Sequence, residues 1–151
     1  MISIQRILVP TDFSESSNLA LRYGKEFAKT FGAELHLLHV IEDTLLYGGS
    51  MPVPPVVFEE MEKTVREQFK KLVTDEERED LKARTLSRTG SPFVEICRYA
   101  KEENIDLIVI GTHGRGPIAH MLMGSVADRV VHKAPCPVLS VRPEEHEFVM
   151  P

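Results

Sequence analysis

The chain has 151 residues, of which 42% are hydrophobic and 27% are charged, values that are ordinary for one globular domain with its own core. Its net charge of -5 disfavours a general nucleic-acid binder, because such a protein needs a basic surface to neutralise phosphates. The longest aliphatic run, at 107–110, is too short to cross a bilayer, and the first residues have no long apolar segment typical of a signal peptide. We therefore expect a single cytoplasmic domain over residues 1–151, with neither nucleic acid nor membrane as a partner.

The first third of the chain predicts a strand, a helix and a second strand. The run RILVP at 6–10 and the run at 33–41 are nearly continuously apolar, which favours strands buried on both faces. A helix is predicted from Ser14 to Phe31, and Gly32 is suited to end it. Its apolar stripe consists of Leu19, Ala20, Tyr23, Phe27 and Phe31. Two glycines and three prolines in residues 45–55 predict a loop.

The middle of the chain predicts a long helix followed by an edge strand. The helix runs from about Val56 to Val73, with an apolar stripe of Val57, Met61, Val65, Phe69 and Leu72. Its polar side carries three opposite-charge pairs at i, i+4: Glu59–Lys63, Glu62–Arg66 and Glu67–Lys71. Residues 74–80 are interpreted as a solvated helix end. Residues 81–88 predict an edge strand protected by charge, with Lys82, Arg84 and Arg88 on one face.

The last third predicts two further helix–strand units. A helix begins at Ser91-Pro92, a cap followed by proline at the first helical position, and continues with Phe93, Ile96, Cys97 and Ala100. A buried strand follows at 106–111. Another helix begins at Ser125, with Val126, Ala127, Val130 and Val131 facing inward, and the last strand occupies 136–141. This alternation predicts a doubly wound, Rossmann-like α/β fold with a five-stranded parallel sheet in the order 3-2-1-4-5 and helices on both faces.

A candidate ligand site lies at the ends of the first and fourth strands. Open α/β sheets bind ligands beyond the carboxyl ends of their strands, where the strand order reverses. Glycines at 111, 114 and 116 allow backbone N–H groups to converge on phosphate oxygens, and Gly124-Ser125 opens the next helix. His113 and Arg115 add cationic side chains. The alternative is that Gly111 and Gly114 serve a tight strand exit and that Ser125 is an ordinary N-cap.

The spacing of these glycines resembles a known family. The chain has neither G-x-x-x-x-G-K-(S/T) nor G-x-G-x-x-G after its first strand. Instead, Gly111-x2-Gly114-x9-Gly124-Ser125 matches the G-2x-G-9x-G-(S/T) motif of the ATP-binding branch of the universal stress protein family. The segments ILVPTDFSESS and GSVADRVVHKAPCPVLSVRP also resemble that family. The likeness covers residues 2–143.

The resemblance implies a ligand, a set of site residues and an assembly. The ligand is ATP, with Mg²⁺ or Mn²⁺ held mainly by its phosphates. Adenosine is expected beside Pro10, Thr11 and Asp12 and against Val40, although Asp12 could instead cap the first helix with Glu15 three residues on, and Val40 could be a core residue. Ribose and phosphates are expected on Gly111, His113, Gly114, Arg115, Gly116, Gly124, Ser125 and Val126. The last strand implies a homodimer through Val138 to Arg142.

Catalytic patterns are scarce in this sequence. It lacks HExxH and Ser–His–Asp spacing, and Cys97 and Cys136 lack the neighbours of a zinc site, which favours two reduced, buried thiols. We expect an ATP-binding stress-response or regulatory protein with slow or no hydrolysis. The alternatives are an ATP-hydrolysing or nucleotidyl-transferring enzyme and a nucleotide-independent interaction module. AMP or a cyclic nucleotide could also take the place of ATP.

Overall fold

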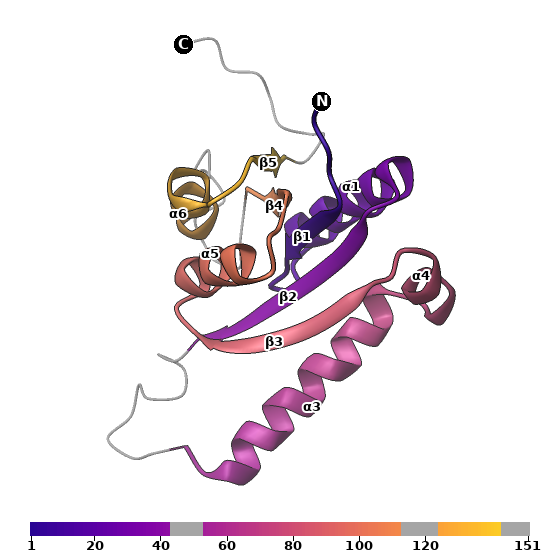
Figure 1. Cartoon of the computed structure of the whole chain (residues 1–151). Helices are drawn as coiled ribbons and strands as arrows, with labels where there is room; N and C mark the ends of the chain where they lie inside the picture. The colour runs from indigo at the N-terminus through magenta and orange to yellow at the C-terminus, as the bar shows by residue number, and fades with distance from the viewer. Residues whose placement is uncertain (43–52, 113–123, 143–151) are drawn as a thin grey trace.

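The computed structural model describes residues 1–42, 53–112 and 124–142. Its parallel sheet has the order β3-β2-β1-β4-β5, which confirms the predicted fold class and strand order (Figure 1). The strands are β1 (Arg6–Pro10), β2 (Glu34–Glu42), β3 (Arg84–Gly90), β4 (Leu107–Gly111) and β5 (Val138–Val141). The helices are α1 (Glu15–Phe31), α3 (Pro55–Leu72), α4 (Asp75–Asp80), α5 (Pro92–Glu102) and α6 (Ser125–Lys133).

The central strand β1 pairs with β2 on one side and with β4 on the other. Arg6 lies opposite Glu34, and Ile7 lies opposite Leu107. The chain leaves β1 through α1 to reach β2, whereas it returns from β3 through α5 to reach β4. Because these two connections run in opposite directions along the sheet, the strand order reverses between β1 and β4. The carboxyl ends of these two strands are therefore the place where this fold class puts a ligand.

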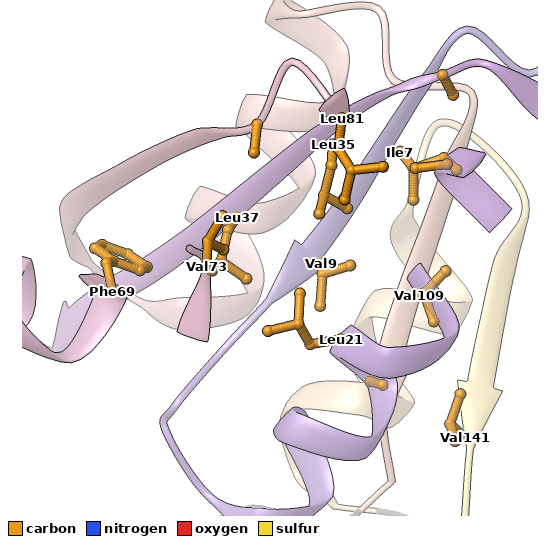
Figure 2. Packing of buried hydrophobic residues seen from close by; sticks show 14 of the residues in the cluster. Ile7, Val9, Leu21, Leu35, Leu37, Phe69, Val73, Leu81, Val109 and Val141 are labelled. Carbon is orange, nitrogen blue, oxygen red and sulfur yellow. The ribbon is translucent and has the colours of Figure 1, made fainter. Parts of the chain in front are cut away.

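Each face of the sheet has its own hydrophobic core. Ile7 and Val9 of β1 point to the face covered by α1 and α3, where they meet Leu35, Leu37 and Val109 (Figure 2). Leu8, between them, points to the face covered by α5 and α6. The second core also holds Leu38, Ile96, Ile108, Ile110 and Val130. Burial on both faces explains why the strands are continuously apolar rather than alternating.

The buried stripe of α1 differs from the predicted one. Tyr23 and Phe31 are 44% and 48% exposed, so their assignment to the buried face is wrong. The buried positions instead carry mostly small residues: Ser16, Ser17, Ala20, Leu21, Gly24 and Ala28. A Cβ on Gly24 would lie 2.5 Å from Cγ2 of Val9, so the small stripe lets α1 lie close against β1. Ser14 caps this helix and Gly32 ends it in the left-handed region, as predicted.

Residues 74–80 are not the end of the preceding helix, as the sequence had suggested. They contain the separate helix α4, because Thr74 and Glu77 form a capping box that starts a new helix after Val73. In α3, Val65 and Phe69 are buried, whereas Val57 is 45% exposed. None of the three predicted i, i+4 pairs of α3 forms an ion pair within the part of the chain that the structure describes.

Strand β3 lies at the edge of the sheet, as predicted, but begins at Arg84 instead of residue 81. Lys82 has a φ of 47°, in the left-handed region, so the chain turns there and cannot yet be extended. Arg84 and Arg88 share one face, and both form ion pairs with carboxylates of the α5 region: Glu103 with Arg84, and Glu95 and Glu102 with Arg88. The charge on this edge therefore also attaches β3 to α5.

In α6, Ala127 and Val130 are buried as predicted, whereas Val131 is 42% exposed, so its predicted inward orientation is wrong. The short helix has room for one narrow stripe against the sheet. Of the predicted loop at 45–55, residues 45–52 lie outside the described residues. Pro54 is the N-cap of α3 and Pro55 is its first residue.

Candidate functional site

The exit of β1 is held in position by β2. The backbone N–H of Thr11 donates to the carbonyl of Leu38 at 2.8 Å, and the side chain of Thr11 is buried against Ser17, with their hydroxyl oxygens 3.1 Å apart. Nδ1 of His39 lies 2.8 Å from the carbonyl oxygen of Thr11. Since a carbonyl can only accept, Nδ1 of this imidazole carries a proton. The predicted site residues Pro10 and Thr11 thus occupy a strand end that is hydrogen-bonded to its neighbours.

Asp12 shapes the turn between β1 and α1 but does not cap the helix. Its Oδ1 accepts the N–H of Ser14 at 3.0 Å, and Ser14 is the N-cap, whose hydroxyl accepts the N–H of Ser17. The capping role considered for Asp12, with Glu15 as its partner, is therefore wrong, because the helix begins two residues later than that role needs. Phe13, between Asp12 and Ser14, has a φ of 63°, in the left-handed region. The centroid of its ring lies 4.6 Å from that of His39.

Val40 and Gly111 have clear packing roles. Val40 packs partly buried against the core on the α5 and α6 face, as its interpretation as a core residue predicts. A Cβ on Gly111 would lie 2.5 Å from Oγ of Ser16 and 2.6 Å from its backbone oxygen. Gly111 is therefore needed for close contact between the end of β4 and the first turn of α1, which supports its interpretation as a strand-exit glycine.

The N-terminus of α6 lies directly at the end of β4. The N–H of Gly124 donates to the carbonyl of Thr112, so the chain returns after residue 123 to the point that it left. Gly124 is the N-cap of α6 and has no side chain that could cap the helix. Ser125 is the first residue of the helix, and its side chain is exposed. The interpretation of Ser125 as an ordinary N-cap is therefore wrong. His113, Gly114, Arg115 and Gly116 lie outside the described residues.

A pocket of about 250 Å³ adjoins this helix end on the α5 and α6 side of the sheet. Seven residues line it: Glu42, Ser91, Pro92, Phe93, Ser125, Val126 and Arg129. They come from the end of β2 and from the N-terminal turns of α5 and α6. Of the predicted site residues, Ser125 and Val126 line this pocket. The sequence marked the helix start at Ser91-Pro92, but its position beside α6 depends on the packing of α5 against α6.

Burial is the main cause of the shifted pKa values of the two cysteine thiols. Burial raises the pKa of the Cys97 thiol, and burial with the nearby Asp106 and Cys97 raises the pKa of Cys136 to about 11. Both thiols are therefore protonated at neutral pH and weak as nucleophiles or metal ligands. Within the described residues, no group of three or more His, Cys, Asp or Glu side chains could hold a metal ion. The described helices include none that is long and apolar enough to cross a membrane.

The sequence and the fold both match known proteins. The model of the universal stress protein family matches residues 3–142. Universal stress protein MJ0531 of Methanocaldococcus jannaschii is 33% identical over 95% of this chain and 85% of its own length. Universal stress protein MJ0577 of the same organism is 33% identical over 93% of this chain and 96% of its own length.

Solved structures agree with these sequence matches. The structure of MJ0577, described as a structure-based assignment of the biochemical function of a hypothetical protein, superposes with a TM-score of 0.77 and 30% identity over 96% of this chain and 100% of that one. A universal stress protein in complex with cAMP superposes with a TM-score of 0.63 and 24% identity over 93% of this chain and 98% of that one, a likeness of fold alone. The chain belongs to the universal stress protein family.

Proposed function

We propose that this chain is a cytoplasmic, single-domain ATP-binding protein that regulates a stress response and hydrolyses ATP slowly or not at all. The nucleotide lies at the carboxyl edge of the sheet, where β1 and β4 meet. Adenosine contacts the exit of β1 and the end of β2. Ribose and phosphates contact the segment that follows β4 and the start of α6. The residues involved are Pro10, Thr11, Asp12, Val40, Gly111, His113, Gly114, Arg115, Gly116, Gly124, Ser125 and Val126.

One observation carries this proposal: the uncapped N-terminus of α6 is attached to the end of β4. The first N–H groups of a helix have no partner within the helix, and with the helix dipole they attract an anion such as phosphate. In α1 and α4, the side chains of Ser14 and Thr74 accept one of these N–H groups. In α6, as in α3 and α5, no side chain of the described residues does so, and an anionic ligand at α6 would satisfy these donors.

The conformation of Gly124 also supports a ligand. Its φ of -64° and ψ of 152° are open to any residue, so the backbone does not require glycine here. A close approach between the backbone and a phosphate group would require it, because a Cβ would stand between them. This differs from Gly111, where Ser16 of the protein itself occupies the space of a side chain.

The types of the predicted site residues support slow or absent hydrolysis. Phosphoryl transfer needs a metal ion and a group that orients the nucleophile. Asp12 is the carboxylate among the proposed site residues, and its Oδ1 already accepts the N–H of Ser14. One carboxylate supplies a single side-chain ligand to a metal ion, so Mg²⁺ or Mn²⁺ would be held mainly by the phosphates of the nucleotide.

Calorimetric titration with ATP·Mg²⁺, AMP and cAMP tests the proposal, and cAMP is included because another protein of this fold has been solved with it. The wild type is expected to bind ATP, and Gly124→Val is expected to abolish binding while the protein stays folded, as its circular dichroism spectrum would show. Thr30→Val, at the exposed end of α1, is the control and should bind like the wild type. No heat from any nucleotide would contradict nucleotide binding. Wild-type affinity in Gly124→Val would contradict the placement at α6, and many turnovers of phosphate release would favour the enzyme.

A further inference from the structure

The turn between β1 and α1 contains a strained residue. Phe13 has a φ of 63°, in the left-handed region, which bulky residues rarely adopt because their Cβ lies too close to the backbone. Among the described residues, the other non-glycine positions with a positive φ are Lys82 and Asn104, and both lie in turns that precede a strand, at the amino-terminal edge of the sheet. Phe13 follows β1, so its strain lies at the carboxyl edge, where the nucleotide is proposed to bind.

Two aromatic contacts keep Phe13 in this conformation. The centroid of its ring lies 4.6 Å from that of His39 on β2, with an angle of 32° between the two ring planes. The ring also meets Phe69 of α3 edge-on, with 5.5 Å between the centroids. Phe69 is buried in the core on this face of the sheet, and Phe13 packs against that core. The packing of one ring against both β2 and α3 therefore offsets the cost of the left-handed backbone.

His39 holds both of the residues that flank Asp12. Its Nδ1 donates to the carbonyl oxygen of Thr11 at 2.8 Å, and its ring contacts that of Phe13. The N–H of Phe13 in turn donates to Oγ1 of Thr11 at 3.0 Å. Asp12 is thus placed between two residues that are fixed to each other and to β2, and its own Oδ1 accepts the N–H of Ser14. A change at His39 or at Phe13 would therefore alter the position of Asp12.

A connection that only had to join β1 to α1 would be served better by glycine in place of Phe13. Glycine adopts a positive φ without strain, as Gly32 does at the other end of α1, where its φ is 65°. Strained residues persist where the surrounding structure holds them, and they are concentrated at ligand sites. The aromatic ring supplies what glycine lacks, a fixed attachment of this turn to β2 and α3.

We propose that Phe13 and His39 are positioning residues of the nucleotide site. They hold Asp12 in the orientation in which it binds adenosine, and they do so without contacting the nucleotide themselves. The contact of Phe13 with Phe69 extends this support to α3. This inference rests on the proposed function, since it assumes that adenosine binds beside Asp12.

A double-mutant cycle, measured by calorimetric titration with ATP·Mg²⁺, tests this role. Phe13→Gly allows the same backbone conformation and removes the ring, and it should weaken binding about tenfold, as expected when a hydrogen bond to a charged group is lost. In the Asp12→Asn background, which can keep the hydrogen bond to Ser14 but loses the charge, Phe13→Gly should have little further effect. Lys82→Gly is the matched control, because it also relieves a left-handed residue but lies at the opposite edge of the sheet, and it should bind like the wild type.

Two substitutions of His39 give a second reading that leaves Phe13 in place. The amide of His39→Asn can donate to the carbonyl of Thr11 as Nδ1 does, but it has no ring to contact Phe13. His39→Leu has neither the donor nor the ring, so it should lose more affinity than His39→Asn does. Circular dichroism checks that each variant is folded, and the two His39 variants decide the question if Phe13→Gly does not fold.

Wild-type affinity in Phe13→Gly or in Asp12→Asn would overturn this inference while nucleotide binding stood. The same loss from Phe13→Gly in both backgrounds would also overturn it, because a residue that acts through Asp12 has nothing left to position once that carboxylate is gone. Wild-type affinity in both His39 variants would remove His39 from the assignment. If the wild type bound no adenine nucleotide at all, both this inference and the proposed function would fall.

Discussion

His36 is a titratable residue in the middle of the sheet with no exposed surface. Its Nδ1 lies 2.6 Å from the hydroxyl of Tyr99 on α5, and its Nε2 lies 3.5 Å from a carboxylate oxygen of Glu34. Burial lowers the pKa of His36, and the nearby Arg84 lowers it further, whereas Glu34 and Glu103 act in the opposite direction. Burial also raises the pKa of Tyr99 to about 12, so its hydroxyl stays protonated at neutral pH.

This arrangement predicts that the protein loses stability in mild acid. Because the pKa of His36 is lower in the folded state than its ordinary value of 6.5, the unfolded chain binds the proton more readily as the pH falls below that value. The stability that the neutral His36 contributes is therefore fully present above the pKa of His36 in the unfolded chain. It is lost as the pH falls toward the lower pKa of His36 in the folded protein. His36→Gln, which does not titrate, should show a smaller fall in Tm than the wild type when the pH is lowered through this window.

The control for this measurement is His132→Gln, at an exposed position of α6. It removes one histidine without touching the core, and its Tm should depend on pH as that of the wild type does. An equal dependence in His36→Gln and the wild type would contradict the assignment to His36.

For a single residue, the sequence is enough to infer which face of a strand its side chain occupies but not which residues surround it there. His36 and His39 lie on one predicted strand three residues apart, so the alternation of a strand places them on opposite faces. One meets Tyr99 of α5, and the other meets Thr11 and Phe13. These partners come from segments far along the chain, and the packing of the helices, which no local pattern encodes, decides them.

The side chain of Lys25, in α1, contacts both the end of α3 and the first turn of α4. Its ammonium donates to the carbonyl of Leu72, at the end of α3, at 2.7 Å, and to Oε2 of Glu77 at 2.9 Å. Glu77 belongs to the capping box of α4, and its hydrogen bond with Lys25 is the main reason why its pKa is lowered. The end of α3 and the start of α4 are thus both satisfied by one side chain of α1.

We expect Lys25→Met to lower the free energy of unfolding by about 1–2 kcal/mol, because the carbonyl of Leu72 and the carboxylate of Glu77 lose a partly buried charged donor. Urea unfolding followed by circular dichroism measures this loss. Lys29→Met is the matched control, since its ion pair with Glu26 is exposed, and we expect a change of about 0.5 kcal/mol or less. Equal losses in the two variants would show that Lys25 does not connect the helices in solution.

The elements themselves were predictable where the local signal was strong. Ser14, Gly32 and Ser91-Pro92 mark helix ends through caps and turns that depend on a few neighbouring residues. The buried side of α1 was not predictable from large apolar residues, because the contact with β1 selects for small ones and leaves Tyr23 and Phe31 exposed. The break before α4 was missed because its charged sequence contains no glycine or proline.

At the scale of the whole molecule, the strand order was predictable because alternating helices and buried strands restrict a parallel sheet to few topologies. That order brings the exits of β1 and β4 together, as the predicted point of strand-order reversal required. It also leaves β3 and β5 as the two edges of the sheet. Arg84 and Arg88 mark β3 as a charged edge, whereas Val138, Leu139 and Val141 make β5 an apolar one. An apolar edge strand can pair with a second copy.

The backbone of β5 allows a specific test of a homodimer through Val138 to Arg142. The carbonyls of Pro137 and Val141 accept hydrogen bonds from Ile108 and Thr112, so these residues face β4. Since the hydrogen-bonding side alternates along a strand, the N–H of Ser140 points to the open edge. Ser140→Pro removes this donor without removing a bond to β4, and proline is tolerated at such positions.

We expect the wild type and Ser140→Ala to sediment as dimers and Ser140→Pro to sediment as a monomer, all with the same far-ultraviolet circular dichroism spectrum. The physical reason is that a second strand can add to β5 only by receiving its outward N–H groups, and proline both removes one and places its ring in the way. Sedimentation velocity across a range of concentrations makes the measurement. A wild-type monomer would contradict the dimer, and a dimeric Ser140→Pro would place the interface on a surface other than the β5 edge.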